Sequence, residues 1–374
     1  MATRWIPLVL LFATIIINLA EANVPAIFVF GDSTADVGTN TLLPGSLARA
    51  DFPHNGIDFP YSRPTGRFSN GLNSADFLAK LMGYKRSPPP FLSLGNIKSP
   101  LKRNFRGINF ASGGSGILDK TGNSVLTSFG KESNPSSNYS ANQKNVISLA
   151  DQIQQFSVVY TYLEAIMGTV AKNKFLSKSL FIISVGSNDI FGYYHSDSSL
   201  TKKEFLSSLV LTYGNHLKSL LNLGARKIGI VSVPPIGCCP SQRIFNATGG
   251  CLEELNDHAR TFHAMINMEL DKLSSEFKDM KYSLGNAVEM TLNVIENPYP
   301  FNFKEVKAAC CGAGTFNAES FCTPNASLCL NRKEYLFWDL FHPTQAASKL
   351  AALTLYGGEP RFVAPINFSQ LASR

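Results

Sequence analysis

Short apolar runs of strand type alternate along this chain with longer stretches of helical spacing. The strand-type runs are at residues 26–30, 108–111, 180–185 and 225–233. The helical stretches, in which apolar residues recur every three or four positions, are at residues 74–81, 146–167, 203–223, 251–277 and 345–355. Because parallel strands need helical crossovers, this alternation predicts an α/β fold, with a mostly parallel sheet between two layers of helices.

The first 22 residues have the pattern of a secretory signal peptide. Arg4 precedes an apolar run over residues 5–17, and Ala20-Glu-Ala22 matches the small-x-small cleavage pattern. The alternative is a membrane anchor, but a span needs about 20 apolar residues, more than this run provides. We therefore expect a signal peptide over residues 1–22 and a single domain over residues 23–374, which contain no repeat and no clear linker.

Glycosylation sequons and cysteines agree with secretion to an extracellular location such as the cell wall. Four sequons place candidate glycosylation sites at Asn138, Asn246, Asn325 and Asn367. The seven cysteines all lie in the C-terminal 40% of the chain, where an oxidising compartment favours disulfides.

Cysteine spacing predicts one pairing and leaves one free thiol. Cys238 with Cys251 would close a short loop, and Cys239 is the candidate for the unpaired thiol. The other four would staple the segment before Asp339; they are Cys310, Cys311, Cys322 and Cys329. Zinc is the alternative, but adjacent cysteines without an interleaved histidine suit a tetrahedral site poorly.

The net charge of +7 suggests weak attraction to an anionic cell wall or membrane surface. The basic residues are scattered rather than clustered, which argues against binding of nucleic acid.

Ser33 directly follows the first predicted strand, in the tract Gly31-Asp-Ser33. The carboxyl ends of parallel strands form the edge where α/β proteins bind ligands, so this hydroxyl should face a cleft. Near the other end of the chain, His342 follows Asp339 by three residues. A serine becomes a nucleophile when a base takes its proton, and a carboxylate can orient that base. Ser33, His342 and Asp339 are therefore the candidate catalytic triad.

Donors for a developing oxyanion are expected from turns at strand ends. The candidates are the backbone N–H of Ser33, that of Gly113 in a glycine-rich turn, and the side-chain amide of Asn188. Glycine lets the backbone approach a substrate closely, which favours Gly113 for this role.

Four blocks in this order resemble those of the GDSL (SGNH) hydrolases. They are Gly31-Asp-Ser33 with Asp36, Gly38 and Asn40; Asn109-Phe-Ala-Ser-Gly-Gly114; Gly186-Ser-Asn-Asp189; and Asp339-Leu-Phe-His342-Pro343. The plant GDSL esterase/lipases are indicated by three further tracts, Arg63-Pro-Thr-Gly-Arg-Phe-Ser-Asn-Gly71, Pro234-Pro-Ile-Gly-Cys238 and Cys310-Cys-Gly312.

The resemblance implies a flavodoxin-like, three-layer α/β/α fold and an enzyme without metal or organic cofactor. It also implies Ser33 as nucleophile, Gly113 and Asn188 as oxyanion donors, and His342 as base with Asp339 behind it. Thr34 departs from the leucine of the family name, at a position outside the chemistry. The polar loop at residues 119–144 is longer than is usual in the family and follows Gly113 closely, so we expect it to shape the mouth of the substrate site.

The predicted function is that of a secreted serine hydrolase that cleaves a carboxylic ester of a lipid, small molecule or polymer through an acyl-enzyme on Ser33. An acyltransferase would use the same residues with a different acceptor. A non-catalytic secreted binding protein is a further alternative, which a missing Ser33, Asn188 or His342 would favour; all three are present.

Overall fold

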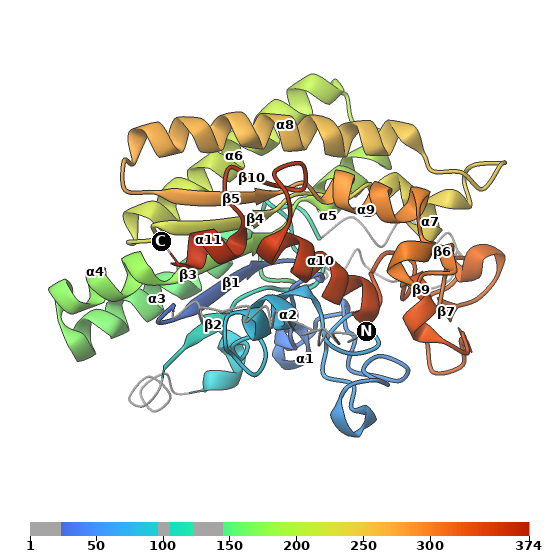
Figure 1. Cartoon of the computed structure of the whole chain (residues 1–374), viewed down its shortest axis with the longest axis horizontal. Coiled ribbons are helices and arrows are strands. Elements are labelled where there is room, and N and C mark those ends of the chain that lie inside the picture. Colours follow the sequence, from blue (N-terminus) through green and yellow to red (C-terminus); the bar gives the residue numbers. More distant parts are fainter. Residues whose placement is uncertain (1–23, 96–104, 123–144, 374) are drawn as a thin grey trace, which may run out of the picture.

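The computed structural model describes residues 24–95, 105–122 and 145–373 (Figure 1). The predicted signal peptide at 1–22, the sequon at Asn138 and most of the polar loop at 119–144 lie outside these residues.

A six-stranded sheet forms the centre of the fold, in the order β10-β5-β4-β3-β1-β2. Its strands are β1 (Ile27–Gly31), β2 (Gly107–Asn109), β3 (Leu180–Ser184), β4 (Lys227–Val231), β5 (Lys281–Gly285) and β10 (Val363–Ala364). All neighbours pair in parallel except β10 with β5, which is antiparallel. Without β10, this is the 2-1-3-4-5 order of flavodoxin-like folds, so the predicted fold class is confirmed.

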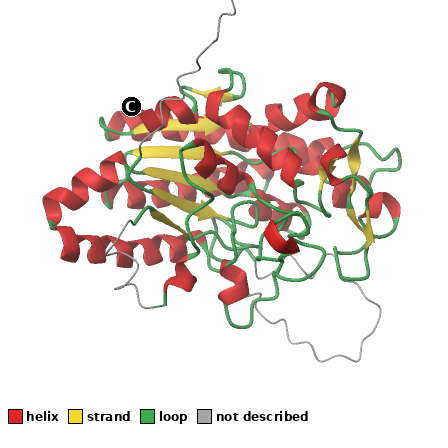
Figure 2. Ribbon diagram, turned by 60° about the horizontal axis from the view of Figure 1, so that its bottom comes forward, coloured by secondary structure: helices red, strands yellow, loops and turns green. Residues whose placement is uncertain are grey.

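Helices cover both faces of this sheet, and loops gather at one end of it (Figure 2). One face carries α3 (Leu149–Met167), α6 (Lys202–Asn222) and α8 (Glu253–Glu276), and the other carries α2 (Ser74–Leu81), α10 (Gln345–Gly357) and α11 (Phe368–Ser373). Strand β1 is buried throughout and sends alternate side chains into the two layers of core. A strand covered on both sides has no polar face, which is why it reads as an apolar run.

Several elements are absent from the sequence-based prediction. They are α1 (Thr39–Leu42), α4 (Thr169–Lys178), α5 (Ser187–Tyr194), α7 (Pro240–Arg243), α9 (Ala287–Glu296), β5, β6 (Glu305–Ala309), β7 (Cys311–Gly312), β8 (Ser327–Leu328), β9 (Tyr335–Phe337), β10 and α11. Strand β5 has the sequence Lys-Tyr-Ser-Leu-Gly and is a strand because it completes the ladder of β4. The short pairs β6–β9 and β7–β8 form two small sheets beside the main one (Figure 1).

Three disulfides join the six cysteines that the spacing assigns to bridges, so that prediction is confirmed. The pairs are Cys238–Cys251, Cys310–Cys329 and Cys311–Cys322. Cys239 is the free, buried thiol, as expected. Because these sulfur atoms are bonded to one another, they are not available as zinc ligands.

None of the helices in the described ranges combines the length and apolarity that crossing a bilayer requires.

Candidate active site

Ser33 lies in the loop that leaves β1 at the edge of the sheet. The strand ends at Gly31, whose φ is 145°, and a Cβ there would lie 2.1 Å from the carbonyl oxygen of Ser184 on β3. Only glycine permits this backbone conformation and this close approach. Since β2 and β3 lie on opposite sides of β1, the chain leaves at the point where the strand order reverses, which is the usual ligand site of such sheets.

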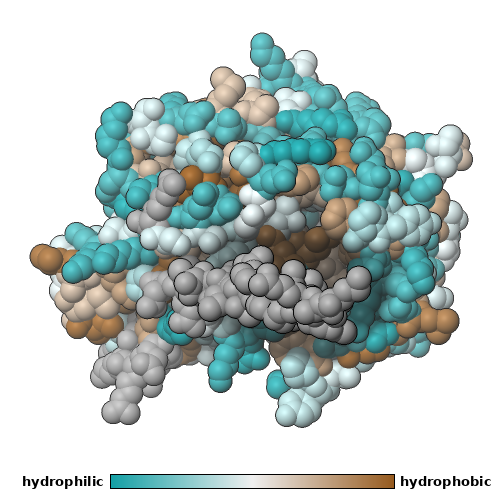
Figure 3. All heavy atoms as spheres, in the orientation of Figure 1, coloured by the Kyte–Doolittle hydropathy of each residue, from teal (hydrophilic) through white to brown (hydrophobic). Residues whose placement is uncertain are grey.

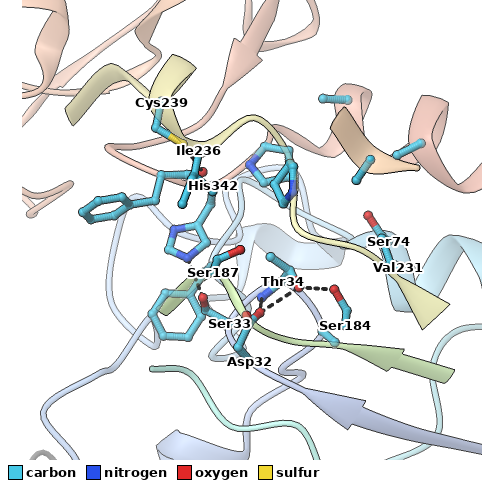
Figure 4. Close-up of a pocket in the computed structure, with 18 of the residues that line it drawn as sticks. Asp32, Ser33, Thr34, Ser74, Ser184, Ser187, Val231, Ile236, Cys239 and His342 are labelled. Atoms are coloured by element: carbon cyan, nitrogen blue, oxygen red, sulfur yellow. Dashed lines mark hydrogen bonds between the residues drawn. The ribbon is translucent and has the colours of Figure 1, made fainter. Parts of the chain in front are cut away.

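The structure brings Ser33, His342 and Asp339 into one hydrogen-bonded line. The Ser33 hydroxyl lies 2.8 Å from Nε2 of His342, whose Nδ1 lies 2.8 Å from each carboxylate oxygen of Asp339. The backbone N–H groups of Phe341 and His342 also donate to Asp339 Oδ1, at 2.9 and 2.8 Å. Figure 4 shows Ser33 beside His342 in the wall of a pocket. This is the geometry of a nucleophile, a base and an orienting acid.

The charges in this line favour an imidazolium next to a carboxylate. Burial alone would lower the pKa of His342, but the charge and hydrogen bond of Asp339, with the charge of Asp32, hold it above its ordinary value. Burial would raise the pKa of Asp339, but the charge and hydrogen bonds of His342 hold it below its ordinary value. Asp339 is therefore ionised near neutral pH, where its charge can stabilise a protonated His342.

Two of the expected oxyanion donors are free to act. Among the described residues, the N–H of Ser33 has no hydrogen-bond partner. The side-chain amide of Asn188 donates to the carbonyl oxygen of Ser115 at 2.8 Å, which orients the amide and uses one of its two hydrogens. Asn188 also lines the pocket, so its second hydrogen is available there.

The contacts of Gly113 argue against the oxyanion role predicted for it. Its N–H donates to Oδ2 of Asp36 at 2.9 Å, and its carbonyl oxygen accepts from Asn40 at 2.8 Å. A Cβ on Gly113 would lie 2.5 Å from the ring of Phe68, so packing already explains the glycine. Gly114 lines the pocket instead, and within the described part of the chain no group accepts its N–H. Burial raises the pKa of Asp36 and outweighs the lowering effect of its backbone N–H donors, so that the pKa is about 6.

The tract at residues 63–71, which sequence reasoning left without a role, supports the histidine. The Phe68 ring packs against the imidazole of His342, with centroids 5.0 Å apart. Oδ1 of Asn70 accepts the N–H of Gln345, the first residue of α10, at 2.8 Å. Because α10 begins three residues after His342, this bond fixes the loop that carries the base.

A chain of polar groups lies under the nucleophile (Figure 4). The hydroxyl of Thr34 donates to Oδ1 of Asp32 at 2.8 Å, and Ser184 lies 2.8 Å from the same hydroxyl. The N–H of Thr34 also donates to Asp32. Burial raises the pKa of Asp32, and the bonds from Thr34 lower it. The threonine that departs from the family name therefore binds a buried acid whose charge acts on His342.

A large apolar cavity of about 660 Å³ opens at these residues. Besides Ser33 and His342, its wall includes Phe191, Ile236 and Phe341, and it continues beneath α10. Its volume is within the range of small-molecule sites, which is about 300–1,000 Å³.

In the described ranges, the one group of side chains with metal-ligand spacing is Cys238, Cys251 and Glu253. Two of its three members form a disulfide, so this group does not suit a metal.

Comparison with known proteins identifies the family. Residues 27–355 match the model of the GDSL-like lipase/acylhydrolases. Two GDSL esterase/lipases of Arabidopsis thaliana are each 34% identical to this chain. One aligns over 94% of this chain and 91% of its own length, and the other over 88% and 87%.

A structural comparison finds Est24, a carbohydrate acetylesterase from Sinorhizobium meliloti, at 14% identity and a TM-score of 0.34, covering 87% of this chain and 94% of that one. This likeness is too low to support a conclusion about substrate. The family match and the plant relatives lead to one conclusion: the chain belongs to the GDSL-like lipase/acylhydrolase family and is a carboxylic ester hydrolase.

Proposed function

We propose that this protein cleaves esters through a covalent acyl-enzyme on Ser33. The observation that carries the proposal is the unbroken hydrogen-bonded line from the Ser33 hydroxyl through His342 to Asp339. As Oγ attacks the ester carbonyl, Nε2 of His342 takes its proton, and Asp339 stabilises the imidazolium. The histidine then gives the proton to the leaving alcohol, and water releases the acid by the same steps in reverse.

The oxyanion of each tetrahedral intermediate would be held by three N–H donors. These are the backbone groups of Ser33 and Gly114 and the side-chain amide of Asn188. We assign Gly114 in place of Gly113 because, in the described ranges, its N–H has no acceptor, and because it lines the pocket.

The test is hydrolysis of a nitrophenyl ester by the purified protein and by the Ser33→Ala variant. We expect the variant to lose roughly 10⁴-fold or more in kcat, since removing a triad serine leaves only the oxyanion donors and binding. Ser187→Ala provides the matched control, because Ser187 lines the same pocket without bonding to His342. Equal activity in wild type and Ser33→Ala would contradict the proposal.

Acyl transfer would proceed through the same acyl-enzyme, with an alcohol in place of water. Adding an alcohol such as glycerol to the assay distinguishes the two, because a transferase forms the new ester faster than the free acid.

We also propose that the protein is secreted after removal of residues 1–22. The three disulfides support this, because such bonds persist in oxidising compartments. Among the sequon asparagines in the described ranges, Asn325 is exposed and is the most accessible to glycosylation. The side-chain oxygens of Asn246 and Asn367 each accept a backbone hydrogen bond. Expression with and without residues 1–22, followed by a glycosidase shift of the protein in the medium, tests secretion and glycosylation together.

A further inference from the structure

The cavity at Ser33 continues away from the catalytic residues, between the sheet and a layer of helices. Helix α10 lines it with Ala347, Leu350, Ala351 and Thr354. These positions are spaced i, i+3, i+4 and i+7, so they form one stripe along the helix. Such a stripe ordinarily packs on a sheet. Here it borders open space that is continuous with the site of Ser33.

The opposite wall is the sheet face that α10 covers. Ile182 of β3 and Val231 of β4 line the cavity there, and Ala75 and Leu78 of α2 close it from the side. Alanines at positions 75, 347 and 351 leave room that larger side chains would fill. Figure 3 shows hydrophobic side chains in a hollow of the molecular face where α10 runs in Figure 1.

This arm of the cavity, defined by the lining residues of α2, α10, β3 and β4, is mainly apolar, and its polar lining side chains are the hydroxyls of Ser74, Ser184 and Thr354. None of these lining residues is charged. The hydroxyl of Ser184, where the arm meets the site, is already bonded to Thr34 at 2.8 Å. A polar ligand would find few partners along the α10 stripe, because the hydroxyl of Thr354 already donates to the carbonyl oxygen of Leu350 at 3.1 Å. Such a ligand would lose the partners it has in water. The arm therefore suits a slender hydrocarbon.

The length of the arm gives the number of carbons that a chain needs to span it. From Ala347 to Thr354 is seven residues, or about 10 Å along the helix axis. An extended chain advances roughly 1.2 Å per bond, since three backbone bonds span about 3.3–3.6 Å. About nine carbons would lie against α10 alone.

We propose that this arm binds the acyl chain of the substrate and selects esters of unbranched acids of about ten carbons or more. The inference rests on the proposed function, because the chain enters from an ester held at Ser33. It adds the chemical class of the acyl group.

A ladder of blocking substitutions along α10 tests the arm. The substrates are nitrophenyl butyrate, octanoate and laurate, compared by kcat/KM. For wild type, we expect kcat/KM for laurate to exceed kcat/KM for butyrate by about tenfold or more. Thr354→Phe, at the far end of the arm, should lower kcat/KM for laurate by about tenfold and leave kcat/KM for octanoate unchanged. Ala351→Phe, one turn nearer to the triad, should lower kcat/KM for both laurate and octanoate. It should change kcat/KM for butyrate by less than about twofold.

Leu353→Phe is the matched control on the same helix. Leu353 is 46% exposed, so the added ring faces solvent, and all three esters should react as in wild type. If both blocking variants show an equal fall in kcat/KM for all three esters while this control does not, the α10 stripe has only a structural role. The proposal would then be overturned.

Binding of sodium laurate to Ser33→Ala, measured by calorimetry, separates the arm from the chemistry. We expect laurate to bind and butyrate to bind far more weakly, with laurate binding lost when Ala351→Phe is added. If wild type hydrolyses butyrate as fast as laurate and Ser33→Ala binds no laurate, the arm proposal fails and the esterase proposal stands. If laurate binds in this way but no ester is cleaved, the arm stands and the proposed function fails.

Discussion

His342 is held by a neighbour in the sequence, Asp339, and by two groups from distant parts of the chain, Ser33 and Phe68. Asp339 accepts from Nδ1, Ser33 approaches Nε2, and Phe68 packs against the ring. A neutral imidazole must therefore exist in one orientation, ready to take the serine proton.

The first prediction concerns pH. Only neutral His342 can act as a base, and Asp339 raises the pKa of this histidine above its ordinary value of about 6.5. Activity should therefore rise with pH through an apparent pKa above 6.5. Asp339→Asn removes the charge that raises the pKa, so the rise should move to lower pH while kcat falls about 10⁴-fold. A pH profile of kcat/KM measures both, and an unmoved profile in the variant would contradict the assignment of Asp339.

The second prediction concerns the oxyanion. Asn188→Ala removes one donor from the transition state, and we expect kcat to fall about 10²–10³-fold with little change in KM. The same variant also loses the bond to Ser115, so its thermal midpoint must be compared with that of wild type. A loss confined to KM would show that Asn188 binds substrate rather than the transition state.

At the scale of elements, buried polar groups hold loops against helices around the site. Asn73 and Asp76 form a reciprocal capping box at the start of α2. Asp76 also accepts from Arg67, at 2.7 and 2.9 Å, with both side chains buried. This pair ties the loop that carries Phe68 to α2.

Removing one partner of this pair should be costly. Asp76→Asn leaves the Arg67 charge buried without a counter-charge, and we expect a loss of about 3–5 kcal/mol in the free energy of unfolding. Glu276→Gln breaks the exposed pair with Lys218 and should cost at most about 1 kcal/mol. Urea titration of both variants provides the measurement; similar losses in the two would contradict the role of the buried pair.

At the scale of the whole molecule, the three disulfides bind segments near the site. Two of them, Cys310–Cys329 and Cys311–Cys322, lie in the stretch that leads to Asp339. They close loops of 19 and 11 residues. In the chain-entropy view, each loop of this size contributes about 3 kcal/mol by restricting the unfolded chain.

Reduction should therefore lower the thermal midpoint by roughly 10 °C or more. Burial raises the pKa of Cys239 to about 12, so the native protein should show no fast-reacting thiol near pH 8. Denaturation without reductant should release that single thiol. Calorimetry with and without reductant, together with thiol titration, checks this; several thiols before reduction would contradict the pairing.

Sequence patterns predicted most of the main sheet and the three side chains that the structure brings into one hydrogen-bonded line, because both depend on local signals. The buried strands β1 and β3 are apolar runs in the sequence. Asp339 precedes His342 by three residues. Strand β5 was missed because its residues are not apolar throughout, and its pairing with β4 makes it a strand. Helix α9 was missed although its apolar residues have helical spacing.

The sequence by itself determined the α/β class, the candidates for nucleophile, base and acid, and the cysteines that pair, because each follows from residue type and spacing. Only the tertiary structure decided which of two neighbouring glycines, Gly113 or Gly114, has a backbone N–H without an acceptor in the described ranges. Gly113 and Gly114 are alike in sequence, and the difference is that Asp36 lies beside one of them. It also decided that the stripe on α10 borders a cavity, since spacing shows which side chains share a face but not how closely the sheet approaches that face.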